Sequence, residues 1–155
     1  MGYDELSSFD ADINNEGSPT FLGDKRLEGA TFPKSIRGST PKLAGSCQIT
    51  RAAEESAYLM RFHIRCPHCR TEQTLKWGGK DDPFGLKWSK DALGEVEKAW
   101  YLCESGNGCT FEHYEMVEAS RTGRYICEKT GVWTRDSMEW FGADDAPIRT
   151  PRRLT

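Results

Sequence analysis

The sequence has 155 residues, of which 37% are hydrophobic and 29% charged, and its formal net charge is -3 at pH 7. This length allows one domain or two small units with a modest core. The near-neutral charge excludes a global attraction to nucleic acid, and no apolar run approaches the roughly 20 residues that span a bilayer. Since no signal-peptide stretch opens the chain, we expect a reducing, cytoplasmic setting, where paired cysteines favour metal over disulfides.

The N-terminal third is predicted to hold two helices and a short strand. Residues 19–28 form the first predicted helix, because Pro19 suits a first turn and Gly29 can end it. A strand is expected at residues 34–37 and a second helix at 47–55. The chain begins abruptly at its acidic pair, with no complete strand before it, so we expect a segment cut from a longer protein.

The rest of the chain is predicted to be mainly short strands. Residues 58–65 alternate between apolar and polar side chains, as in a half-buried strand. Further strands are expected at 73–77, 85–88, 100–102 and 110–112. A polar, weakly helical insertion is expected at 91–97 and a helix at 112–120. A final hairpin around Thr130-Gly131 pairs 124–127 with 137–140, and the tail from Gly142 onward is interpreted as a linker or an interrupted continuation.

Four cysteines in two pairs are the strongest chemical signal. Cys66 and Cys69 are two residues apart in a tight turn, whereas five residues separate Cys103 from Cys109. Two such turns at hairpin tips can supply four thiolates to a structural zinc ion. The alternatives are free buried thiols, three disulfides, or a redox pair at Cys66-Pro67-His68-Cys69; a redox pair normally opens a helix, and here a strand is expected to follow.

The remaining cysteines and histidines give weaker signals. Cys47 and Cys127 lie outside both turns and are expected to be small buried hydrophobic residues. His68 is expected to face solvent inside its turn. His113 lies four residues after Cys109 and could replace a cysteine ligand if the second turn were distorted.

Two short polar motifs are unremarkable in isolation. Asp4 and Glu5 form an adjacent acidic pair, and nucleotide-hydrolysing folds use such a pair to hold magnesium and to polarise the attacking water. Ser39-Thr40-Pro41 is a hydroxyl-rich turn after a short strand. Composition alone accounts for both.

The order and spacing of these motifs over nearly the whole chain resembles the large terminase subunit of lambda-like tailed phages (the GpA type). The segments that carry the resemblance are Gly2-Tyr3-Asp4-Glu5-Leu6, Glu16-Gly17-Ser18-Pro19, Lys25-Arg26, Lys34-Ser35-Ile36-Arg37-Gly38-Ser39-Thr40-Pro41, Arg61-Phe62-His63 with Cys66-Pro67-His68-Cys69, Pro83-Phe84-Gly85-Leu86-Lys87-Trp88, Tyr101-Leu102-Cys103-Glu104 and Arg124-Tyr125-Ile126-Cys127-Glu128-Lys129-Thr130-Gly131. That family packages viral double-stranded DNA into a procapsid with an ATPase motor and cuts concatemers with a nuclease. Its partners are a small terminase subunit and a portal ring, in the cytoplasm of a bacterial host.

The resemblance implies a role for each motif. Asp4 matches the magnesium-binding acid of the Walker B pair, and Glu5 matches the carboxylate that orients the attacking water. Ser39 and Thr40 match the coupling motif that senses the terminal phosphate of ATP. The four cysteines resemble a zinc-ribbon-like insert after the ATPase core. Gly142 onward would approach the nuclease domain.

The sequence also departs from that family in ways that matter for activity. It contains no Gly-x-x-x-x-Gly-Lys-Ser/Thr phosphate loop and no aspartate cluster for a two-metal nuclease. Arg70 stands where a glycine would ease the first cysteine turn. The gap between Cys103 and Cys109 is long. We therefore expect a fragment that neither hydrolyses ATP nor cuts DNA alone.

The fold class predicted from these observations is α+β: the C-terminal edge of a P-loop-type ATPase domain, followed by a small antiparallel zinc-ribbon-like insert. The expected divisions are a partial ATPase domain at 1–56, the zinc-ribbon-like region at 57–130, and a hairpin and linker at 131–155. Other interpretations are a degenerate prophage remnant and a freestanding zinc-ribbon module that binds DNA or a protein. Such a module would use interleaved basic and aromatic residues, although tryptophans in a core explain them more simply; these residues are Lys76, Trp77, Lys80, Lys87 and Trp88.

Overall fold

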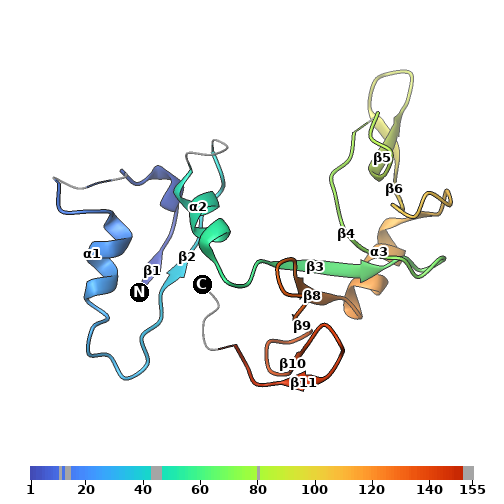
Figure 1. The fold of residues 1–155 in the computed structure, drawn as a ribbon. Helices are drawn as coiled ribbons and strands as arrows, with labels where there is room; N and C mark the ends of the chain where they lie inside the picture. Colours follow the sequence, from blue (N-terminus) through green and yellow to red (C-terminus); the bar gives the residue numbers. More distant parts are fainter. Residues whose placement is uncertain (11, 13–14, 43–46, 80, 152–155) are drawn as a thin grey trace. The chain divides into compact units, whose positions relative to one another are not determined.

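The computed structural model describes residues 1–10, 12, 15–42, 47–79 and 81–151, and the chain divides into two compact units, Met1–Ala57 and Tyr58–Leu154 (Figure 1). The chain mixes a few short helices with several small sheets. No helix in the described part of the chain has the length and apolar character needed to cross a membrane. The units are taken in turn below.

The first unit is built on a two-stranded parallel sheet. Its elements are β1 (Gly2–Tyr3), a 3-10 turn at Leu6–Ser8, α1 (Pro19–Lys25), β2 (Ile36–Arg37) and α2 (Gln48–Glu55). β1 pairs with β2 in parallel, with Gly2 opposite Ile36 and Tyr3 opposite Arg37. Parallel strands need a crossover connection, and the segment that contains α1 supplies it. Both helices are confirmed, with α1 ending earlier than predicted.

Side chains from all three elements of this crossover converge on Asp24 of α1. The Tyr3 hydroxyl donates to Asp24 Oδ1 at 2.9 Å, and an Arg37 guanidinium nitrogen lies 2.8 Å from Asp24 Oδ2. Burial raises the pKa of Tyr3, and its bond to the Asp24 carboxylate raises it further. Burial opposes ionisation of Asp24, but its bonds from Arg37 and Tyr3 leave the pKa lower than usual. One carboxylate therefore ties both strands to the helix.

The second unit contains the remaining elements of the chain, arranged in two antiparallel sheets and one helix (Figure 1). A six-stranded sheet has the order β11-β10-β9-β8-β3-β4, and a three-stranded sheet has the order β5-β6-β7. The elements are β3 (Met60–Arg65), β4 (Glu72–Thr74), β5 (Gly85–Lys90), β6 (Val96–Leu102), β7 (Thr110–Phe111), α3 (His113–Arg121), β8 (Arg124–Cys127), β9 (Trp133–Thr134), β10 (Trp140–Phe141) and β11 (Pro147–Ile148).

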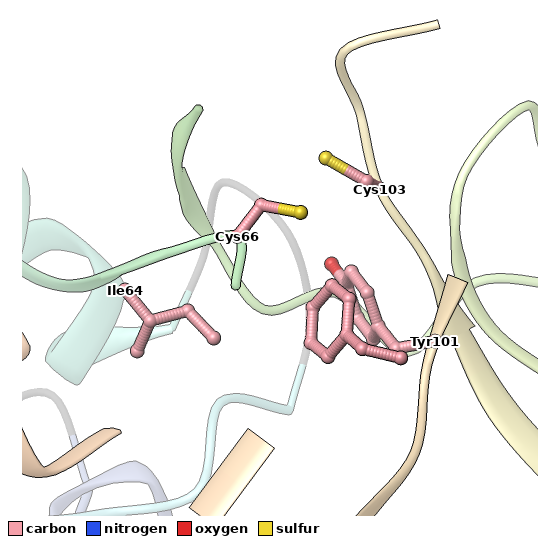
Figure 2. Packing of buried hydrophobic residues seen from close by; sticks show 5 residues of the cluster. Ile64, Cys66, Tyr101 and Cys103 are labelled. Atoms are coloured by element: carbon pink, nitrogen blue, oxygen red, sulfur yellow. The ribbon is translucent and has the colours of Figure 1, made fainter. Parts of the chain in front are cut away.

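The core of this unit lies where the two sheets and α3 meet. Its hydrophobic cluster consists of the buried side chains of Ile64, Cys66, Tyr101, Cys103 and Phe111, and Figure 2 shows Ile64 and Tyr101 on either side of the Cys66 backbone. The Tyr101 and Phe111 rings pack with centroids 5.0 Å apart. The alternation predicted for 58–65 is confirmed at Ile64, which is buried between the half-buried His63 and the exposed Arg65.

Three expectations for the second unit are wrong. Residues 91–97 are not helical: Asp91 Oδ1 accepts from the backbone N–H groups of Leu93 and Glu95, both at 2.9 Å. Since Gly94 adopts a φ of 85°, these bonds close a tight turn between β5 and β6.

The C-terminal strands also differ from the prediction. β8 pairs with Trp133–Thr134 and not with 137–140, because the Cys127 N–H bonds to the Val132 carbonyl at 2.8 Å and closes a shorter turn. The tail is not simply a linker, since Pro147–Ile148 pairs with β10. Residues 152–155 lie outside the described part of the chain.

Gly123 lets α3 turn closely onto the sheet. A Cβ atom at this position would lie 2.4 Å from Phe62 Cζ and 2.9 Å from the His63 carbonyl oxygen. We predict that Gly123→Ala lowers the free energy of unfolding by about 1–3 kcal/mol through overpacking, as measured by urea denaturation. In a Phe62→Leu background, where the ring is gone, the same change should cost less; an equal cost in both backgrounds would contradict this origin.

Candidate functional site: a four-cysteine cluster and a polar strand end

Each predicted cysteine pair lies at the tip of a β-hairpin. Cys66 and Cys69 lie in the turn between β3 and β4, and Cys103 and Cys109 lie between β6 and β7. The first turn is closed by bonds from the Cys66 N–H to the Thr71 carbonyl (2.9 Å) and from the Arg70 N–H to the Cys66 carbonyl (3.0 Å). The predicted strand–turn–strand arrangement is confirmed at both pairs.

The longer second turn is made compact by its glycines. Gly106 and Gly108 have φ values of 74° and 71°, a left-handed conformation that glycine adopts at little cost. The Cys103 N–H bonds to the Cys109 carbonyl at 2.9 Å, so the five intervening residues loop outward and the two cysteines stay adjacent. The unequal spacing therefore does not keep the second pair from presenting both sulfur atoms.

Three of the four sulfur atoms form a close group, and the fourth lies beside one of them. The Sγ atoms of Cys66, Cys69 and Cys109 lie within 4.8 Å of one another, and Cys103 Sγ lies 3.7 Å from Cys69 Sγ. Figure 2 shows the Cys66 and Cys103 sulfurs pointing toward each other from the two hairpins. Four thiolates at about 2.3 Å around one tetrahedral zinc would be about 3.8 Å apart. The spacing of the Cys66, Cys69 and Cys109 sulfurs is therefore near that of a tetrahedral thiolate site, and Cys103 lies outside this group but next to Cys69.

The surroundings of the cluster favour ionisation of one thiol in particular. Hydrogen bonds from the Thr71 and Ser105 hydroxyls lower the pKa of Cys69 to about 5. Burial raises the pKa of Cys66 to about 11, and burial also raises that of Cys109. A cation among these sulfurs would provide the charge that the buried thiols need to deprotonate.

Gln73 lies beside the cysteines and was not singled out from the sequence. Its side chain is buried, with Nε2 3.2 Å from Cys103 Sγ and Oε1 accepting from the Glu104 N–H at 3.1 Å. The amide thus orients a cysteine and the backbone beyond it. The only signal in the sequence is a polar residue at an inward-facing position of a strand.

The other cysteines and histidines stand apart from the cluster. Cys47 and Cys127 are buried and free, as predicted, and all six cysteines are unbridged. His68 is half-exposed with Nε2 3.4 Å from Glu115 Oε1. His113 begins α3, and the grouped potential ligands in the described residues are all cysteines. A strand and not a helix follows Cys69, unlike the redox arrangement.

The second candidate site lies at the carboxyl ends of β1 and β2. Asp4 and Glu5 follow β1, and Ser39 and Thr40 follow β2. The backbone pairing continues beyond the strands, because the Gly38 N–H donates to the Tyr3 carbonyl at 2.8 Å. The Ser7 N–H donates to Ser39 Oγ at 2.9 Å. Since ligands of open parallel sheets bind at the carboxyl ends of the strands, the two motifs share one edge.

The carboxylates at this edge are accessible. Asp4 and Glu5 are exposed, and Asp4 Oδ1 accepts from the Glu5 N–H at 2.9 Å. Glu5 has a φ of 55°, an uncommon conformation for a residue with a side chain. Ser39 is half-buried and bonded to Ser7, whereas Thr40 is exposed.

The expectation that the tryptophans near the hairpins belong to a core is wrong for Trp77, which is 77% exposed, and Trp88 is also exposed. The lysines beside them already have contacts within the chain. Lys87 Nζ donates to the carbonyls of Gly79 and Asp82, and Lys76 Nζ lies 4.6 Å from the Phe84 ring centroid. Lys80 lies outside the described residues.

Arg70 occupies the position in the first cysteine turn where a glycine would ease the backbone conformation. Its φ of 64° is left-handed, a conformation that costs a residue with a Cβ roughly 1–2 kcal/mol. After allowance for the backbone entropy of glycine, we predict that Arg70→Gly raises the free energy of unfolding by about 0.5–1 kcal/mol in urea denaturation. Arg61→Gly, in the extended strand β3, should lower it; a lowered stability in Arg70→Gly would contradict the strain.

The family model for the phage terminase large subunit gpA, ATPase domain, matches residues 1–137, which include both candidate sites. The terminase large subunit of Escherichia phage lambda is 56% identical over 154 residues, and that of Enterobacteria phage P21 is 55% identical over 153 residues. Each alignment covers 99% of this chain but 23% of the relative.

The chain therefore spans about a quarter of the length of these relatives. No solved structure matches it. The match over 137 residues and the identity to two terminases support one conclusion. The chain belongs to the family of phage terminase large subunits of the gpA type, in the region of their ATPase domain.

Proposed function

We propose that this chain forms part of an ATP-driven motor that packages viral double-stranded DNA. The observation that carries the proposal is the position of Asp4, Glu5 and Ser39 at the shared carboxyl edge of two parallel strands, in a chain of the gpA family. In the whole protein, packaging would be accompanied by endonucleolytic cutting of the DNA. The partners would be a small terminase subunit and a portal ring in the cytoplasm of a bacterial host.

In this proposal each polar residue has one task. Asp4 would hold magnesium through water, and Glu5 would accept a hydrogen bond from the water that attacks the terminal phosphate. Ser39, fixed by its bonds to Ser7, and Thr40 would respond to the presence of that phosphate. Since the sequence lacks the phosphate loop and its lysine, ATP would be bound only together with residues outside this chain.

We also propose that Cys66, Cys69, Cys103 and Cys109 hold a structural zinc ion. The support is the close grouping of the Cys66, Cys69 and Cys109 sulfurs from two hairpin tips, with Cys103 Sγ 3.7 Å from Cys69 Sγ. All four positions would be filled by protein, so the ion would have no open place for a reacting water. Its contribution would be to join the two sheets of the second unit.

The zinc proposal predicts a single zinc ion per chain, measured by mass spectrometry of the purified protein. Cys66→Ser and Cys103→Ser should lose the ion and unfold the second unit, because metal binding supplies on the order of 10 kcal/mol to such sites. Zinc should also be released on acidification, since the thiolates must be protonated. Cys127→Ser is the matched control: this cysteine is buried in the sheet, so zinc should remain. Full folding in chelator without zinc would contradict the proposal.

The motor proposal predicts the behaviour of a chimera, in which this chain replaces the matching segment of the phage lambda large subunit. The chimera should hydrolyse ATP and package DNA. Glu5→Gln should reduce ATP hydrolysis by at least about 100-fold, because the attacking water loses its base. Glu16→Gln, at an exposed acid of the same unit, should leave the rate unchanged. Hydrolysis by Glu5→Gln at the parent rate would reject the assignment.

A further inference from the structure

We propose that a cleft between α3 and the edge of the six-stranded sheet binds a phosphate group of the DNA backbone; this inference rests on the proposed packaging function. The cleft has a volume of about 570 Å³ and lies wholly within the second unit. Four arginines and three glutamates line it: Arg65, Arg70, Arg124, Arg135, Glu72, Glu115 and Glu118. Whether this mixture of charges attracts an anion depends on which of the groups are already paired with one another.

The glutamates of the cleft are all engaged within the protein. Glu72 accepts two bonds from the Arg124 guanidinium, both at 2.8 Å, and this pairing lowers the pKa of Glu72. Glu115 Oε2 accepts from the Glu112 N–H at 3.0 Å, within the capping box of α3. Glu118 Oε2 lies 3.3 Å from Arg121 Nε. Glu72 and Glu118 are thus each paired with an arginine, whereas Glu115 is held by the Glu112 N–H and by His68, whose Nε2 lies 3.4 Å from Glu115 Oε1.

Two arginines of the cleft have no such acidic partner. In the described ranges of the chain, neither Arg70 nor Arg135 forms an ion pair with a carboxylate, and both are exposed. Arg135 lies over the Trp133 ring, 5.5 Å from its centroid, and that ring stacks on Phe141 at 4.2 Å. The cleft therefore presents two guanidinium groups, whose planar donors match phosphate oxygens.

The backbone strain at Arg70 supports a functional role for this residue. A left-handed residue with a side chain persists at a cost in stability, and such outliers gather at binding sites. Arg70 also follows Cys69 directly, so the four-cysteine cluster fixes the point from which its side chain extends. Glycine would suit the turn better but would remove the guanidinium.

An aromatic side chain at the cleft favours a nucleic acid over an acidic protein segment. Tyr114 lines the cleft and is 68% exposed. An exposed ring beside unpaired arginines can contact the sugar or base next to a bound phosphate. An acidic peptide would need the cations but would gain less from the ring.

The test uses the full 155-residue chain with zinc bound and a short, fluorescently labelled DNA duplex. Affinity is measured by anisotropy over a series of salt concentrations. Arg70→Gln and Arg135→Gln should each weaken binding and reduce the slope of log affinity against log salt by about 1, the effect of losing one phosphate contact. The double variant should lose both contacts.

The control variant is Arg149→Gln, which removes the same charge from an exposed arginine of the same unit outside the cleft. It should leave the slope unchanged. The zinc content of every variant is measured, and Arg135→Gln provides a result independent of the cysteine turn if Arg70→Gln loses metal.

Three outcomes would overturn the inference. The first is failure of the parent chain to bind the duplex. If the chimera with the phage lambda large subunit still packages DNA in that case, the motor proposal stands while the cleft proposal fails. Equal slopes for the double variant and the parent would place any DNA contact elsewhere. Displacement of the duplex by polyglutamate at lower concentration than by polyphosphate would identify the cleft as a site for an acidic protein segment.

Discussion

Cysteine sulfur atoms from the tips of two hairpins lie close together, and two of these cysteines belong to the buried core of the second unit. Cys66 belongs to one sheet and Cys103 to the other, and both are fully buried beside Ile64 and Tyr101 (Figure 2). The apolar cluster is small, so hydrophobic burial alone gives this unit modest stability. A metal that joins the sulfurs would connect the two sheets and add stability that the core does not provide.

The cleft that presents unpaired arginines is a consequence of the same arrangement. Arg70 belongs to the first cysteine turn, α3 is placed by the buried Phe111 just before it, and Arg135 follows the strand that pairs with β8. Loss of a metal from the cysteines would then also alter the charge of the cleft, because unfolding of the first cysteine turn would displace Arg70. The polar edge of the first unit depends instead on Tyr3, Asp24 and Arg37, whose bonds hold the strands that precede both motifs.

Local patterns in the sequence predicted much of this structure. The alternation before Cys66, the proline at the start of α1 and the cysteine spacing each reflect a constraint that acts within a few residues. Position 70, where a glycine would ease the turn, is an instructive case, since the turn does require a left-handed residue and Arg70 supplies it. The prediction at 91–97 was wrong because hydrogen bonds to the Asp91 side chain form a turn there. The prediction for the final hairpin was wrong because a shorter turn after Cys127 pairs β8 with β9.

The sequence by itself determined the local elements, the two cysteine turns and, through its resemblance, the terminase family, because these depend on neighbouring residues and on motif order. Only the tertiary structure decided that sulfurs from the two cysteine turns lie together, that Gln73 contacts Cys103, and that the loops after β1 and β2 share an edge. The physical reason is that each of these results joins residues far apart in the chain. Their proximity depends on how strands pair and pack, which no local pattern specifies.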